Sequence, residues 1–279
     1  RTPLSCTGGS NPPLSAMNLF FHIQVLIFFI LFQPLVFSQK RTLEDYNKDV
    51  FYFKKDSIKY RILEPYYKEN KPVPLFIFLH GAGERGNDNN SQLIHGSNFF
   101  MRETEKKQFN SYIIFPQCPK NSRWSYHKVD PWIKKNDLED KKSISSYGNL
   151  VIELIQYLIE KKNIDKNRIY ISGLSMGGYG VFDLVSYRPE IFAAAAPICG
   201  GADLDLLQNA IDVPFWIFHG DMDRVVSVYN SRKAYNFLLE KSKKNILYTE
   251  YKGVYHNAWD FVFKEENFFD WFFKKNKNQ

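Results

Sequence analysis

The stretch ISGLSMGGYG, residues 171–180, places one serine, Ser175, between glycines directly after a run of β-branched and aromatic residues. The segment Arg168–Ile171 at its start is typical of a strand, and Tyr179–Tyr187 at its end is typical of a helix. Glycines stand two positions before and two positions after the serine. Because glycine has no side chain to collide with a neighbouring strand or helix, this order predicts a sharp turn that exposes the serine hydroxyl at the carboxyl end of the strand.

Short apolar runs alternate with helical patterns along the rest of the chain, as expected for strands joined by crossover helices. The other predicted strands are Ile58–Leu63, Leu75–Leu79, Tyr112–Phe115, Ala193–Ile198, Phe215–Phe218 and Ile246–Tyr251. The other predicted helices are Tyr147–Asn163, Tyr229–Lys244 and Lys264–Lys275. We therefore expect an α/β fold with a mostly parallel central sheet and helices on both faces.

Composition limits the classes of protein to which the chain can belong. It has 279 residues, of which 44% are hydrophobic and 17% aromatic, and this is enough apolar material for one sizeable core. The net charge of +7 comes from 37 basic and 30 acidic residues that are interspersed, so no basic block indicates a nucleic-acid partner. No metal-ligand spacing and no phosphate-binding loop indicates a metal or a cofactor.

The amino-terminal region has the features of a targeting segment rather than of a fold. The unbroken apolar run Val25–Phe32 is shorter than the ~20 residues that a membrane-spanning helix needs. We predict a signal peptide at 17–38, preceded by an upstream segment at 1–16 and followed by a single domain at 39–279. Cleavage after Ser38 would give a secreted or periplasmic protein without stable membrane insertion, and an uncleaved anchor is the alternative.

Three residues could form a catalytic triad in the order serine, acid, histidine. Ser175 lies in a Gly-x-Ser-x-Gly motif, and His256 is the histidine that follows both this motif and a later strand. Asp221 and Asp223 follow the predicted strand Phe215–Phe218. We favour Asp223 as the acid because it lies further into the loop, with Asp221 shaping the turn and His219 as a structural residue.

A second glycine-containing loop, FLHGAGERG at 78–86, follows another predicted strand. Its backbone can approach a substrate closely, so we predict an oxyanion hole formed by the N–H groups of Met176 and Ala82, with Gly81 as the alternative to Ala82. We expect the charged pair Glu84 and Arg85 to brace this loop, with contact to the substrate as the alternative.

These motifs resemble those of a known family. PLFIFLHGAGERGNDN, FPQCP, ISGLSMGGYGVFDLVSYRPEIFAAAAPICGG, FHGDMDRVV and GVYHNAWD together look like secreted esterases of the α/β-hydrolase fold, similar to carbohydrate esterase family 1, feruloyl esterases and polyhydroxybutyrate-depolymerase-like proteins. The resemblance implies that Ser175 is the nucleophile, Asp223 the acid and His256 the base. It also implies that the Tyr112–Phe115 strand lies beyond the Leu75–Leu79 strand from the serine, which would keep the Cys118 and Cys199 thiols free.

The resemblance implies hydrolysis of carboxylic esters without a cofactor, with feruloyl or acetyl esters of plant cell-wall polysaccharide as candidate substrates. Trp124 and Trp259 are candidate substrate-binding residues, and Tyr126 and Trp132 lie near Trp124 on the long segment Gln117–Lys142. The alternative for these aromatic residues is packing onto the body of the protein. The alternative functions are a serine peptidase of the prolyl-oligopeptidase type and a non-catalytic binding module on the same fold.

Overall fold

The computed structural model describes residues 41–126 and 144–278. The upstream segment predicted at 1–16, the signal peptide predicted at 17–38 and Trp132 lie outside the described residues. Within the described ranges, no helix has the length and apolar character that crossing a membrane would require.

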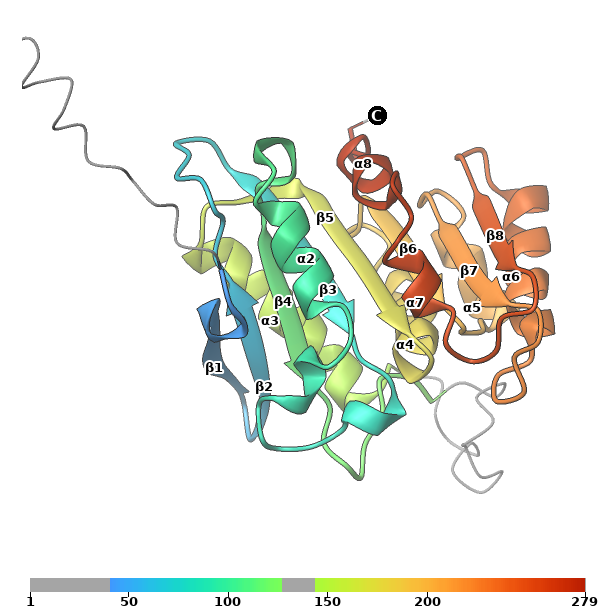
Figure 1. The fold of residues 1–279 in the computed structure, drawn as a ribbon, viewed down its shortest axis with the longest axis horizontal. Helices are drawn as coiled ribbons and strands as arrows, with labels where there is room; N and C mark the ends of the chain where they lie inside the picture. Colours follow the sequence, from blue (N-terminus) through green and yellow to red (C-terminus); the bar gives the residue numbers. More distant parts are fainter. Residues whose placement is uncertain (1–40, 127–143, 279) are drawn as a thin grey trace, which may run out of the picture. The chain divides into compact units, whose positions relative to one another are not determined.

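An 8-stranded sheet organises the described chain, with the strand order β1-β2-β4-β3-β5-β6-β7-β8 (Figure 1). The strands are β1 (Tyr46–Phe53), β2 (Asp56–Leu63), β3 (Val73–Leu79), β4 (Tyr112–Gln117), β5 (Ile164–Leu174), β6 (Ala194–Ile198), β7 (Trp216–Gly220) and β8 (Leu247–Tyr251). The pairs β1–β2 and β2–β4 are antiparallel. The pairs from β4 through β8 are parallel, which confirms the predicted α/β fold.

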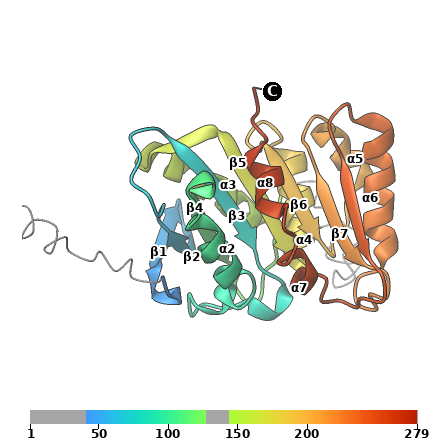
Figure 2. The same ribbon diagram turned by 45° about the horizontal axis from the view of Figure 1, so that its top comes forward.

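Helices cover both faces of this sheet, as Figure 2 shows from a second angle. The helices of eight or more residues are α2 (Ser97–Thr104), α3 (Ser146–Lys161), α4 (Met176–Tyr187) and α6 (Val228–Lys241), and the shorter ones are α5 (Leu204–Leu207), α7 (Trp259–Val262) and α8 (Phe268–Phe273). Single 3₁₀ turns are η1 (Leu43–Asp45), η2 (Ala82–Glu84), η3 (Ser91–Leu93), η4 (Lys107–Phe109) and η6 (Gln208–Ala210).

The hydrophobic core is divided by the sheet into two parts, because alternate strand residues point to opposite faces. On β3, Leu75 and Ile77 pack with the buried side chains of α3 and α4, whereas Phe76 and Phe78 pack with those of α2 and α8. The second part is dominated by phenylalanine: the ring of Phe76 lies 4.7 Å from that of Phe272. Both faces of the central strands are therefore buried, which explains why these strands are continuous apolar runs.

Two elements of eight residues each, β1 and α2, were not predicted from the sequence. Strand β1 alternates only weakly, because most of its side chains are at least partly exposed at the edge of the sheet. Its position is set by antiparallel pairing with β2 along its whole length. Helix α2 begins after Gly96, which has a φ of 83°, and buries an aromatic face against the sheet. Both elements depend on contacts with distant parts of the chain.

The helix predicted at Lys264–Lys275 is confirmed only over α8, and its predicted start is wrong. A turn separates α8 from the preceding helix α7, which ends at Val262. The N–H of Phe268 donates to the carbonyl oxygen of Glu265 in this turn. The buried side chains of α8 are Phe268, Phe269, Trp271 and Phe272. This nearly continuous aromatic set needs contacts on more than one side of the helix.

The predicted order of the central strands and the state of the two cysteines are confirmed. Strand β4 lies beyond β3 from β5, as expected. Cys118 and Cys199 are both buried and neither forms a disulfide. Because β3, β5, β7 and β8 run parallel, the segments that follow them emerge at the same edge of the sheet, and these segments contain the candidate catalytic residues.

Candidate active site

Ser175 lies between β5 and α4 with φ 54° and ψ −115°, a conformation that non-glycine residues rarely adopt. A Cβ atom on Gly177 would lie 2.0 Å from the carbonyl oxygen of Leu79, and one on Gly173 would lie 2.8 Å from the same oxygen. Both glycines are therefore required by close packing, as the sequence indicated. Such backbone strain costs about 1–3 kcal/mol and persists only where the surrounding structure imposes it. Here the N–H of Ser175 donates to Ile198 of β6 at 2.8 Å.

His256 lies on the loop between β8 and α7 and contacts both other residues of the predicted triad. The Ser175 Oγ lies 2.8 Å from His256 Nε2, and His256 Nδ1 lies 2.6 Å from Asp223 Oδ2. Because an ionised carboxylate only accepts hydrogen bonds, the hydrogen of a neutral His256 is placed on Nδ1. The Nε2 atom is then an acceptor for the serine proton.

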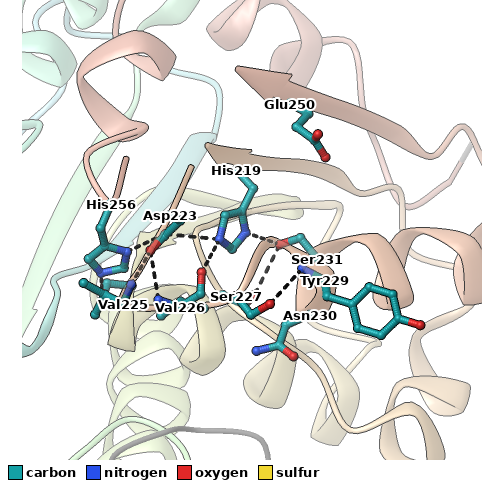
Figure 3. A network of polar contacts seen from close by, with 12 residues as sticks. His219, Asp223, Val225, Val226, Ser227, Tyr229, Asn230, Ser231, Glu250 and His256 are labelled. Atoms are coloured by element: carbon teal, nitrogen blue, oxygen red, sulfur yellow. Dashed lines mark hydrogen bonds and ion pairs between the residues drawn. The ribbon is translucent and has the colours of Figure 1, made fainter. Parts of the chain in front are cut away.

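Asp223 lies on the loop between β7 and α6 with its side chain fully buried. Its Oδ1 accepts hydrogen bonds from the backbone N–H groups of Val225 and Val226 at 2.8 and 2.9 Å. Burial by itself raises the pKa of the carboxyl, but hydrogen bonds from His219, His256 and these two N–H groups outweigh burial and hold the pKa well below its usual value. Figure 3 shows Asp223 between the two histidines. The carboxylate is therefore ionised and fixed in direction.

The other aspartate of this loop, Asp221, has a different position. Its Oδ1 accepts from the N–H of Gly253, at 2.6 Å, and so joins the loop after β7 to the turn after β8. It is the turn-shaping residue of the two, and the structure brings Asp223, not Asp221, to His256.

A pocket of about 210 Å³ opens beside Ser175. It is lined by Ser175 and His256, the loop residues 81–84, His95, Val225 and Trp259. The predicted oxyanion loop therefore faces the serine. Both Gly81 and Ala82 line this pocket, and the choice between their N–H groups stays open.

His80 and Arg85 hold this loop in position. His80 is buried, its Nδ1 donates to the carbonyl oxygen of Gly81 at 2.6 Å, and its Nε2 accepts from the N–H of Cys118 at 2.9 Å. Burial lowers the pKa of His80 to about 4, so the ring is neutral. Arg85 Nε donates to the carbonyl oxygen of Ala82 at 2.9 Å, which is the bracing role expected for this residue.

The two tryptophans predicted to bind substrate have different environments. Trp124 is fully buried, and its Nε1 donates to the carbonyl oxygen of His80 at 3.0 Å. Its prediction as a substrate-binding residue is therefore wrong, because the ring has no exposed surface and packs under the site instead. Trp259 does line the pocket, with its ring 5.5 Å from that of His256.

Two polar residues of the pocket, Glu84 and His95, contact each other in a way that the sequence did not predict. Glu84 Oε1 lies 3.6 Å from His95 Nε2. The ring of His95 in turn lies 5.4 Å from that of Trp259. His95 precedes Ser175 in the chain, and no local sequence pattern indicates that it lies in the pocket.

Cys199, Asp223 and His256 bring possible metal-ligand atoms within 4.8 Å of one another, and they form the one such group in the described part of the chain. Burial raises the pKa of the Cys199 thiol, which disfavours the thiolate that metals bind. The Asp223 and His256 atoms are already hydrogen-bonded to each other. The cluster is therefore explained by the triad geometry without a metal ion.

The parallel sheet, the strained serine turn and the serine–histidine–aspartate chain together define an α/β-hydrolase. The chain belongs to the phospholipase/carboxylesterase family of this fold, whose family model matches residues 62–267. This match spans most of the described residues and includes all three members of the predicted triad.

Individual relatives agree with this placement. A solved thermostable esterase is 33% identical, with a TM-score of 0.74 over 83% of this chain and 63% of that chain. Poly(3-hydroxyalkanoate) depolymerase C of Paucimonas lemoignei is 27% identical over 90 residues, which are 32% of this chain and 20% of the depolymerase. The chain thus spans less than two thirds of either relative. A CE1 ferulic acid esterase from Anaeromyces mucronatus, solved with ferulic acid, shares the fold at 19% identity, with a TM-score of 0.59 over 85% and 94% of the two chains.

Proposed function

We propose that this protein is a serine carboxylesterase that works through an acyl-enzyme intermediate. The observation that supports it best is the continuous chain of contacts from the Ser175 hydroxyl through His256 to the buried Asp223 carboxylate, with distances of 2.8 and 2.6 Å. Membership of the phospholipase/carboxylesterase family supports the same reaction class.

The reaction proceeds in two halves. His256 Nε2 takes the proton of Ser175 while Oγ attacks the ester carbonyl carbon, and the carbonyl oxygen becomes an oxyanion. The backbone N–H of Met176, with that of Ala82 or Gly81, stabilises this oxyanion, and one such donor contributes about 3 kcal/mol. His256 then donates its proton to the departing alcohol, and water attacks the acyl-serine by the same route to release the carboxylic acid.

For the substrate, we propose small acyl esters, such as acetyl groups on plant cell-wall polysaccharide, ahead of feruloyl esters. The pocket volume of about 210 Å³ is below the ~300–1,000 Å³ typical of pockets that enclose drug-sized ligands. An acetyl group fits inside it, whereas a feruloyl group would extend beyond this volume. The similarity in fold to ferulic acid esterases keeps feruloyl esters as the second candidate.

Initial rates on p-nitrophenyl acetate, methyl ferulate and an aminoacyl-proline anilide test this proposal, with the Ser175→Ala variant as the control. We expect turnover of the acetate ester that is lost in the variant. Faster turnover of methyl ferulate would reverse the order of substrates, and cleavage of the anilide alone would favour the peptidase. Equal ester rates in both proteins would exclude Ser175 as the nucleophile.

We also propose that residues 17–38 direct export. Expression of the whole chain in a secreting host, followed by amino-terminal sequencing of the exported protein, tests this. A mature terminus at Gln39 is expected, and protein retained in the membrane with the segment intact would indicate an anchor.

A further inference from the structure

We propose that His219 is a positioning residue for the reaction proposed above: it holds the Asp223 carboxylate, and the loop that carries it, in the direction that His256 requires. The inference rests on the proposed function for its kinetic consequences. Its geometric basis is independent of the substrate.

The Nε2 side of the His219 ring faces the acid. His219 lies in β7 with its side chain fully buried, and its Nε2 is 3.0 Å from the carbonyl oxygen of Val226 and 3.2 Å from Asp223 Oδ2. Both neighbours are acceptors, so Nε2 carries a hydrogen whether the ring is neutral or charged. One N–H thus contacts both the carboxylate and the loop backbone beside it.

The opposite side of the ring is held as well. His219 Nδ1 lies 2.7 Å from the Oγ of Ser231 on α6 (Figure 3). That Oγ lies 3.2 Å from the carbonyl oxygen of Gly200. Gly200 packs directly against Gly178 of α4, since a Cβ atom on Gly200 would lie 2.5 Å from the Gly178 carbonyl carbon. The ring is therefore fixed between α6 and the acid, and its support reaches the helix that begins after Ser175.

Among the charged and titratable groups around His219 and His256, Asp223 is the anion that both histidines contact. On β8, Glu250 is paired with Arg232, whose Nε and Nη2 donate to it at 2.8 and 2.6 Å. From the end of β6, the Cys199 thiol approaches Asp223, and burial raises the pKa of this thiol, so it stays uncharged. His219 and His256 thus divide the hydrogen-bonding capacity of one carboxylate oxygen.

This sharing has a consequence for His256. A carboxylate that donates less of its electron density to other hydrogen bonds is a stronger partner for an imidazolium. Without the His219 N–H, Asp223 would stabilise the protonated form of His256 more strongly and would also be less constrained in direction. The pH at which the base becomes available would rise, and kcat would fall.

Three substitutions at position 219 separate positioning from packing. His219→Gln places an amide N–H at the position of Nε2, whereas the shorter side chain of His219→Asn places it at the position of Nδ1, and His219→Leu removes it. We expect His219→Leu to lower kcat about 10- to 100-fold with little change in KM, a small part of the ~10⁴-fold effect of disabling the acid itself. The acid limb of the kcat/KM profile should move upward by about half a pH unit or more.

His219→Gln should restore the position of the acid limb and most of kcat, and His219→Asn should not. The rates are measured with p-nitrophenyl acetate in a pH-stat. Ser172→Ala is the control for lost stability, because its Oγ donates to Ala196 inside the sheet, at 2.7 Å, and does not contact the acid. If His219→Leu does not fold, the Gln and Asn variants decide the question between them.

A second readout does not depend on activity. The downfield proton NMR resonance of the His256 Nδ1–H reports its hydrogen bond to Asp223 directly, and its titration midpoint should follow the same order in the three variants. Variants that unfold at lower temperature but keep the wild-type titration and pH profile would show that His219 only packs the core. Absence of ester hydrolysis by the wild type would instead contradict the proposed function, and the resonance would still test the role of His219.

Discussion

Backbone packing positions Ser175, whereas hydrogen bonds position Asp223 and His256. The serine turn is held by glycines so close to neighbouring backbone that no Cβ atom fits, with 2.0 Å to Leu79 at Gly177. The acid is held by four donors, two of them backbone N–H groups and two of them histidines. At the glycines of the serine turn, close packing excludes nearly every substitution. At the hydrogen-bonded residues around the acid, replacements that keep the donor or acceptor are tolerated.

The largest expected effect comes from disabling the acid. Asp223→Asn should lower kcat about 10⁴-fold, equivalent to about 5.5 kcal/mol, because the amide favours the wrong tautomer of His256. The fold should remain. Asp221→Asn is the matched control, because Asp221 lies in the same loop but accepts a hydrogen bond from Gly253 instead. The kcat of this variant should stay within about threefold of wild type. Equal losses in the two variants would contradict the assignment of the acid.

Substitutions at the glycines of the serine turn should lower the stability of the fold rather than change the chemistry of the site. Gly177→Ala places a methyl group against the Leu79 carbonyl oxygen, and we expect it to destabilise the fold by about 3 kcal/mol or more. Gly83→Ala is the control, because nothing lies within 4 Å of the added methyl group. Urea denaturation of the two variants measures the difference. A Gly177→Ala protein as stable as the control would mean that the turn relaxes freely and is not fixed by packing.

We expect the stability of the fold to depend on pH because His80 is buried beneath the oxyanion loop. The pKa of His80 is lowered by burial from 6.5 to about 4, so between these values the unfolded chain binds a proton that the folded chain does not. The contribution of the neutral His80 ring to the free energy of unfolding is therefore fully present above about pH 6.5. It is lost as the pH falls to about 4, which lowers the free energy of unfolding by about 3 kcal/mol.

His80→Gln should flatten this dependence, because its carbonyl oxygen can still accept from the N–H of Cys118 but does not titrate. Urea midpoints from about pH 7 to about pH 4 compare the two proteins. An unchanged slope in the variant would assign the acid sensitivity to other groups.

The smallest effect concerns the two tryptophans. Trp259→Leu should raise KM about three- to tenfold with little change in stability, consistent with the loss of an aromatic contact of about 0.5–1.5 kcal/mol. Trp124→Leu should instead lower the denaturation midpoint and leave KM unchanged, because its ring is fully buried. A raised KM for Trp124→Leu would mean that the ring reaches substrate after all.

The parts of the site that could be predicted are those with a local steric or periodic cause. Gly173 and Gly177 mark the turn because their environment is the strand and helix next to them in the chain, and the apolar strands follow from burial on both faces. Neither β1 nor the late start of α8 has such a cause, since β1 depends on pairing with β2 and α8 on packing against Phe76.

The sequence by itself determined the α/β class, the serine turn and the candidate residues Asp221, Asp223 and His256, because short motifs that follow strands can be recognised locally. Only the tertiary structure decided that Asp223 rather than Asp221 meets His256, that Trp124 is buried while Trp259 lines the pocket, and that His219 contacts the acid. These outcomes depend on the directions in which side chains leave different loops. Directions of that kind are set by the parallel sheet that brings the loops together, and no spacing along the chain encodes them.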